Sequence, residues 1–121
     1  MMGLERASTR STIVRVEAPP KVVFVDVDDT LVRSFGSKRI PIGSVIAHVR
    51  ELHRCGFELY CWSSGGADYA RRSAEELDLV ECFVAFLPKP AVMIDDQHPS
   101  EWSNMTWVHT NEAGSRSPGD Y

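Results

Sequence analysis

Cysteines are few in this chain, and their spacing argues against two kinds of stabilising site. The 121 residues include three cysteines, Cys55, Cys61 and Cys82, and no two of them form a Cys-x-x-Cys pair. An odd number of isolated cysteines in apolar surroundings favours buried, reduced thiols over a disulfide framework or a zinc centre. A chain of this length buries enough surface to fold without either. We therefore expect one domain in a reducing compartment, the cytoplasm.

Long apolar runs and an excess of positive charge are also missing. No run approaches the roughly 18 apolar residues that cross a bilayer, and residues 1–20 lack the apolar core of a signal peptide. The formal net charge of −4 at pH 7 disfavours general nucleic-acid binding, which needs a surplus of Lys and Arg. One basic stretch, with Arg33, Lys38 and Arg39, is either a solvated loop or a surface that meets an anionic substrate.

The chain changes character at Lys21. Residues 1–20 show no hydrophobic periodicity and end in Pro19-Pro20, which predicts a flexible N-terminal arm. The run from Val22 to Val25 is β-branched and aromatic without alternation, which is typical of a strand buried on both faces. This run predicts the central strand of a parallel sheet.

Helical and extended patterns alternate after that strand. Apolar residues recur at helical spacing over Gly43–Cys55 and over Ala67–Leu77. Short apolar runs predict further strands at Phe57–Trp62, Phe83–Phe86, Ala91–Ile94 and Thr106–Val108. Alternation of this kind predicts an α/β fold, a Rossmann-like three-layer sandwich with a mostly parallel five-stranded sheet.

Polar residues follow the predicted strands at the carboxyl edge, where open parallel sheets bind ligands. They are Asp26, Asp28 and Asp29 after the first strand, Ser63, Ser64, Gly65 and Gly66 after the second, and Asp95 and Asp96 after the fourth. Carboxylates gathered in one crevice repel each other unless a hard cation joins them, and Mg²⁺ is the natural candidate. The alternatives are that Asp28 and Asp29 only cap a turn, and that Gly65-Gly66 is only a turn.

The sequence FVDVDDTL resembles the first signature of the haloacid dehalogenase-like (HAD) hydrolases, a buried strand followed by Asp-x-Asp-x-Thr. Ser63 after FELYCW, Lys89 in LPKP and the acidic pair in VMIDD resemble the second, third and fourth signatures, in the same order. The resemblance covers residues 21–96. It implies a HAD-like catalytic domain over residues 21–110, a magnesium-dependent phosphohydrolase, with a flexible C-terminal tail over residues 111–121.

The resemblance also implies a role for each matched residue. Asp26 would be the nucleophile that forms an aspartyl phosphate. Asp28 would protonate the leaving oxygen and later take a proton from water, and an aspartate at this position favours a phosphatase. Lys89 would neutralise charge at the phosphoryl group.

Two groups of residues would hold the substrate and the metal. Ser63, Ser64 and Gly65, at the start of a helix, would bind phosphoryl oxygens. The magnesium ligands would be Asp26, the main-chain carbonyl of Asp28, Asp95 and Asp96.

The chain has no room for the cap domain that many HAD proteins carry. Only a flap of about Val32 to Ile42 remains near the site. An open site suits a phosphorylated macromolecule, or a homo-oligomer in which a neighbouring subunit covers the site. The alternative to both is a monomer that acts slowly on small phosphoesters. Two further alternatives stay open: a catalytically weak regulatory or binding domain that keeps the fold and metal site, and an enzyme that passes phosphate to an acceptor other than water.

Overall fold

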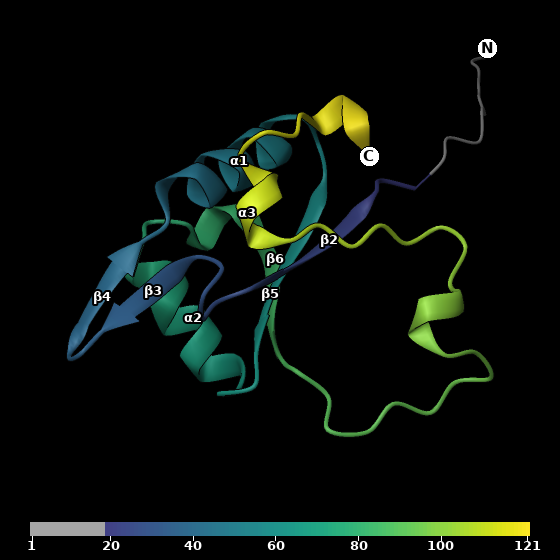
Figure 1. Ribbon diagram of the computed structural model, residues 1–121, viewed down its shortest axis with the longest axis horizontal. Helices are drawn as coiled ribbons and strands as arrows, with labels where there is room; N and C mark the ends of the chain where they lie inside the picture. Colours follow the sequence, from purple (N-terminus) through teal and green to yellow (C-terminus); the bar gives the residue numbers. More distant parts are fainter. Residues whose placement is uncertain (1–18) are drawn as a thin grey trace, which may run out of the picture.

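The computed structural model describes residues 19–121, so nearly all of the predicted N-terminal arm lies outside the described residues. Three parallel strands form the main sheet of this part of the chain, in the order β2-β5-β6 (Figure 1). Their bounds are Val22–Asp26 for β2, Glu58–Ser63 for β5 and Phe83–Pro88 for β6. The predicted α/β fold with a parallel sheet is confirmed.

Two helices connect these strands. Helix α1 (Gly43–Arg54) turns Val45, Val49 and Leu52 towards the core, and the chain leaves it at Gly56, whose φ of +87° favours glycine. Helix α2 (Ala67–Glu76) buries Ala70, Ser73 and Ala74. Both helices occur where the 3.6-residue periodicity predicts them.

The core lies on one face of the sheet. Leu59 and Cys61 of β5 point into it together with the buried side chains of α1 and α2. The strands β2, β5 and β6 lie side by side in the same order as in the sequence. Two right-handed crossovers that advance across the sheet in the same direction place both helices on the same face. On the opposite face Phe24 remains 45% exposed. The three-layer prediction is therefore wrong for the described residues, which form two layers.

The number of strands and the position of β2 also differ from the prediction. β5 is the central strand, while β2 is at an edge and has no second partner among residues 19–121. The predicted strands Ala91–Ile94 and Thr106–Val108 lie in a long loop that contains only the short 3₁₀ helix η2 (Pro99–Glu101). A short apolar run favours extended backbone but does not supply a partner strand, and Pro90 cannot donate to one. The five-stranded sheet is thus wrong.

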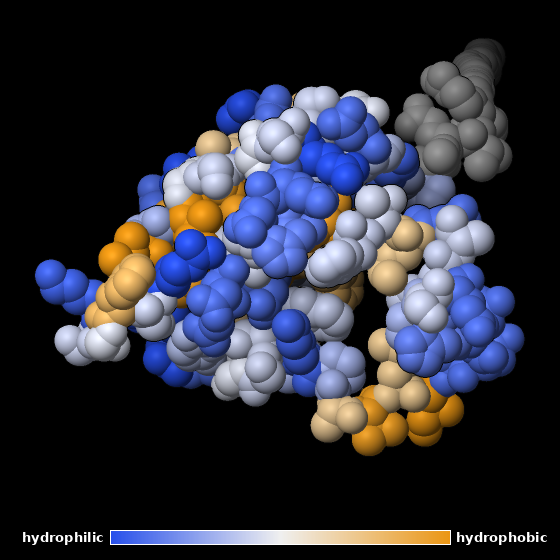
Figure 2. All heavy atoms as spheres, viewed as in Figure 1, coloured by the Kyte–Doolittle hydropathy of each residue, from blue (hydrophilic) through white to orange (hydrophobic). Residues whose placement is uncertain are grey.

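This long loop, residues 89–109, leaves the sheet and swings away from it (Figure 1). Val92 is 78% exposed and Ile94 is 96% exposed. Figure 2 shows apolar residues on the outer surface of the loop, with polar residues around η2. The loop therefore contributes little to the core.

A hairpin stands between β2 and α1. Its strands, β3 (Val32–Phe35) and β4 (Lys38–Pro41), pair in antiparallel fashion and turn at Gly36, where φ is +60°. The hairpin occupies the segment in which the sequence predicts a flap.

Residues 110–121, most of which the sequence assigns to a flexible tail, fold against α1 in the structure. They form α3 (Thr110–Ala113) and the 3₁₀ helix η3 (Pro118–Asp120), and Ala113 is buried. The Tyr121 hydroxyl lies 2.8 Å from Nε2 of His48. No helix within residues 19–121 is both long enough and apolar enough to cross a membrane.

Candidate functional site

Asp26 and Lys89 meet at the carboxyl edge of the sheet. The amide of Lys89 donates to the carbonyl of Ser63 at 2.9 Å, which places the lysine directly after β6 and beside the end of β5. Its side chain passes 5.9 Å from the ring centre of Trp62, and Nζ lies 3.2 Å from Oδ1 of Asp26. The lysine therefore reaches from one edge of the sheet to the other.

Solvent reaches both partners of this ion pair, since 30% of the Asp26 side chain and 37% of the Lys89 side chain are exposed. An exposed pair of this kind contributes little to stability. The structure thus places a carboxylate and an ammonium group, far apart in sequence, in contact at an accessible position.

A tight turn follows Asp26 and presents Asp28. The carbonyl of Val27 accepts the amides of Thr30 and Leu31, and Asp29 adopts a left-handed conformation with φ of +61°. Val27 and Leu31 are fully buried and anchor the turn. Within residues 19–121, the side chains of Asp28 and Asp29 accept no hydrogen bond from the backbone of the turn. Backbone hydrogen bonds and the burial of Val27 and Leu31 stabilise the turn without the aspartate side chains. This counts against the alternative that Asp28 and Asp29 only cap the turn.

Ser63 shapes the next loop. Its side chain is 1% exposed, and its Oγ accepts the amide of Gly65 at 3.0 Å. Ser64 and Gly65 are exposed, and Gly66 precedes α2 with φ of +105° and no side-chain cap. No side chain caps the first amides of α2, whereas the Gly65 amide is already bonded to Ser63 within the loop. Binding of phosphoryl oxygens by Ser63, Ser64 and Gly65 stays a prediction.

Asp95 and Asp96 are not brought to this edge. Both lie exposed in the long loop, where the amide of Gln97 donates to Oδ1 of Asp95 at 2.9 Å. This backbone hydrogen bond is the largest cause that lowers the pKa of Asp95 below its ordinary value. Nowhere in residues 19–121 do three side chains of His, Cys, Asp or Glu come together as metal ligands. The predicted magnesium ligands are therefore only partly assembled.

The predicted ligands that do lie together, at Asp26 and Asp28, offer the kind of donor atom that Mg²⁺ prefers. Mg²⁺ binds oxygen atoms, uses one or two carboxylates and keeps several waters. Asp26 and the main chain of Asp28, two residues apart at the end of β2, offer such oxygens. Asp95 and Asp96 do not belong to this group in the structure.

One residue that contacts the site, Tyr69, was missed as a functional residue from sequence, and Arg39 was considered only within the basic stretch that could meet an anionic substrate. The Tyr69 hydroxyl donates to Oδ1 of Asp28 at 2.7 Å, and this bond is the largest cause that raises the Tyr69 pKa above its ordinary value. Arg39 of the hairpin donates to the Tyr69 hydroxyl at 3.0 Å and pairs with Glu76. The available signal was the polar set Tyr69, Ser73 and Glu76, which recurs at helical spacing on one face of α2.

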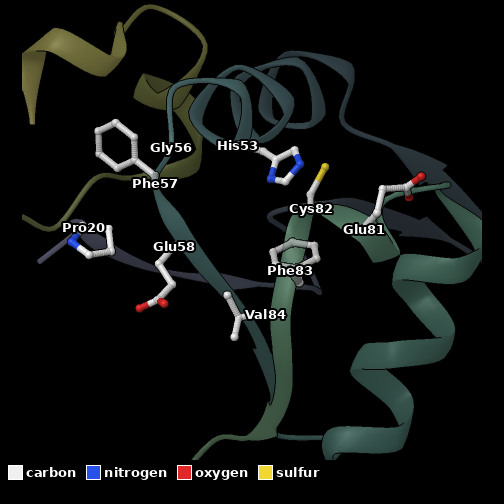
Figure 3. Close-up of a pocket in the computed structure, with 9 residues that line it drawn as sticks. All are labelled: Pro20, His53, Gly56, Phe57, Glu58, Glu81, Cys82, Phe83 and Val84. Carbon is white, nitrogen blue, oxygen red and sulfur yellow. The ribbon is translucent and has the colours of Figure 1, made fainter. Parts of the chain in front are cut away.

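The hollow in Figure 3 lies at the other end of the sheet. It has a volume of about 280 Å³ and is bordered by Pro20, which precedes β2, and by the first residues of β5 and β6, Glu58 and Phe83. None of the predicted site residues lines it. The acidic edge around Asp26 is therefore the better candidate site.

Comparison of the chain with protein-family models, with curated proteins and with solved structures found no match.

Proposed function

We propose that this protein is a magnesium-dependent phosphomonoesterase that acts through an aspartyl phosphate on Asp26. The contact between Asp26 Oδ1 and Lys89 Nζ at 3.2 Å carries the proposal, since it joins the first and third signature residues across the sheet. The exposed position of Asp28 in the adjoining turn supports it. Mg²⁺ held by Asp26 and the main chain of Asp28 would supply further positive charge for the phosphoryl oxygens.

The reaction would proceed in two displacements. A carboxylate oxygen of Asp26 attacks phosphorus, the bond from phosphorus to the leaving oxygen breaks, and Asp28 gives that oxygen its proton. Water then attacks phosphorus and loses a proton to Asp28, while the bond between Asp26 and phosphorus breaks and phosphate departs. Lys89 offsets the negative charge of the phosphoryl group in both steps.

The open surroundings of Asp26 and Lys89 favour a phosphorylated macromolecule as substrate, or a homo-oligomer in which another subunit covers the site. The hairpin beside the site exposes Phe35 and Ile40, apolar side chains that a large substrate would cover. The three free cysteines fit the cytoplasm as the compartment in which it works.

One observation favours a second candidate, a binding domain with weak catalysis. Asp95 and Asp96 stand away from Asp26, so a domain of this geometry would hold the metal with fewer protein ligands. Hydrolysis of a chromogenic aryl phosphate, measured with Mg²⁺ and with excess chelator, separates the two candidates. Turnover that stops on chelation and returns with Mg²⁺ supports the esterase. Binding of phosphate compounds without turnover supports the binding domain.

A further inference from the structure

The carboxylate of Asp28 has a partner that the proposed reaction does not yet use. The Tyr69 hydroxyl donates to its Oδ1 at 2.7 Å. Asp28 is exposed and follows the end of a strand, so a carboxylate with no partner there would sample several rotamers. A hydrogen bond from a side chain on a different element restricts that freedom.

Tyr69 is itself held on two sides. Arg39 donates to the hydroxyl at 3.0 Å, and its guanidinium carbon lies 5.4 Å from the ring centre. The ring also packs on the loop before α2, because a Cβ at Gly65 would lie only 3.0 Å from its Cδ2. The position of the phenol is therefore set by the hairpin and by the backbone of the preceding loop.

The guanidinium group of arginine can only donate hydrogen bonds, so the Tyr69 oxygen accepts one from Arg39 and the Tyr69 hydroxyl donates its own hydrogen bond to another group. That acceptor is the carboxylate of Asp28. Arg39 is in turn held by Oγ of Ser73 at 3.0 Å and by the carboxylate of Glu76. The order of donors is thus defined from Arg39 through Tyr69 to Asp28.

We propose that Tyr69 is a positioning residue that orients the carboxylate of Asp28 for proton transfer, and that Arg39 orients Tyr69. This inference rests on the proposed function, in which Asp28 exchanges a proton with the leaving oxygen and with water. With Oδ1 held by the phenol, Oδ2 is the oxygen that carries the proton. The phenol also stabilises the carboxylate left after the proton has gone.

Leaving-group dependence tests the proposal, because general-acid assistance matters most for poor leaving groups. Tyr69→Phe is expected to lower kcat for an alkyl phosphate by about 10-fold, within the range for a mispositioned catalytic group, and kcat for p-nitrophenyl phosphate by less than about 2-fold. KM should change little for either substrate. Arg39→Gln should give a smaller loss with the same preference.

Tyr60→Phe is the matched control, since Tyr60 lies on β5 and its hydroxyl makes no hydrogen bond with the described side chains. It should leave both rates unchanged. An equal loss on the two substrates in Tyr69→Phe, or no loss on either, would overturn the positioning role.

Asp28→Asn separates failure of this inference from failure of the proposed function. If Asp28→Asn is more harmful for the alkyl phosphate and Tyr69→Phe is not, only the role of Tyr69 is wrong. If Asp28→Asn shows no such preference, or if the native protein hydrolyses no phosphomonoester, the proposed function is wrong and this inference falls with it.

A second measurement does not depend on turnover. A crystal structure of the native protein is expected to place the Tyr69 hydroxyl within hydrogen-bond distance of Oδ1 of Asp28, where the two atoms lie 2.7 Å apart. A Tyr69 hydroxyl that lies beyond hydrogen-bond distance of Asp28 would overturn the inference.

Discussion

At the scale of single residues, the contact between Asp26 and Lys89 should matter more for catalysis than for the stability of the fold. The two side chains are about one-third exposed, at 30% and 37%, so water screens their attraction. An accessible carboxylate beside an ammonium group is, however, well placed to meet a phosphoryl group. Substitutions here should therefore affect activity far more than folding.

Asp26→Asn is expected to lower kcat on the order of 10³-fold or more, because an amide does not form the covalent bond to phosphorus. The melting temperature should change by only a few degrees. Asp29→Asn is the matched control, since asparagine tolerates the left-handed φ of +61° at that position. A variant Asp26→Asn that keeps more than about a tenth of the native rate would remove Asp26 as nucleophile.

The three cysteines should differ sharply in reactivity. Burial, assisted by the nearby charge of Asp26, raises the pKa of Cys61 to about 12, and burial also raises that of Cys82. Cys55 is exposed. The thiolate is the reactive form, so a disulfide reagent should modify one thiol quickly in the native protein and all three after unfolding. Loss of the fast phase in Cys55→Ser would confirm the assignment, and its persistence would contradict it.

At the scale of elements, the C-terminal residues are tied to α1 by a titratable contact. The Tyr121 hydroxyl lies 2.8 Å from Nε2 of His48, and the two rings meet edge to face. Desolvation lowers the pKa of His48 below its ordinary value, although Glu51 and Asp120 partly oppose this. The folded protein therefore favours a neutral His48.

Stability should consequently depend on pH in a defined direction. Because the pKa of His48 is lower in the folded than in the unfolded state, its contribution is fully present above the unfolded value of 6.5 and is lost as pH falls through the folded value. The free energy of urea unfolding should thus decrease from pH 7.5 to about pH 5.5. His48→Gln should flatten this dependence, whereas His53→Gln, an exposed position on the same helix, should not. Equal slopes in the two variants would contradict the contact.

At the scale of the whole molecule, the long loop of residues 89–109 has the least secondary structure and packing to hold it in place. Apart from η2, its residues belong to no helix or strand, and Val92 and Ile94 are exposed. Backbone of this kind opens easily and is cleaved before the sheet and helices. Asp95 and Asp96 lie within it, so its motion bears directly on the proposed metal site.

Among residues 19–121, brief digestion with a protease selective for large apolar residues is expected to cut first within residues 89–109. Mg²⁺ together with inorganic phosphate should slow this cut if Asp95 and Asp96 join the metal site, because ligation would tie down the loop. The double variant Asp95→Asn and Asp96→Asn should lose that protection. A native cleavage rate that does not respond to Mg²⁺ would exclude the two aspartates as ligands.

Local features of this protein followed from the sequence by itself. The periodicity of residues 43–55 and 67–77 identified α1 and α2, because helical spacing depends only on neighbouring residues. The apolar run before Asp26 identified β2, and the rule for parallel sheets placed Asp26 at the carboxyl edge. Lys89 was assigned to the same site only through the family resemblance, and its contact with Asp26 is a finding of the structure.

The tertiary structure alone decided the features that depend on distant partners. It left one face of the sheet open, made β5 rather than β2 central, and kept residues 91–94 and 106–108 out of the sheet. It also brought Tyr69 to Asp28. Strand pairing and side-chain contacts are interactions between segments far apart in the chain. The residues of a short run can favour extended backbone, but they do not determine which other strand the run pairs with.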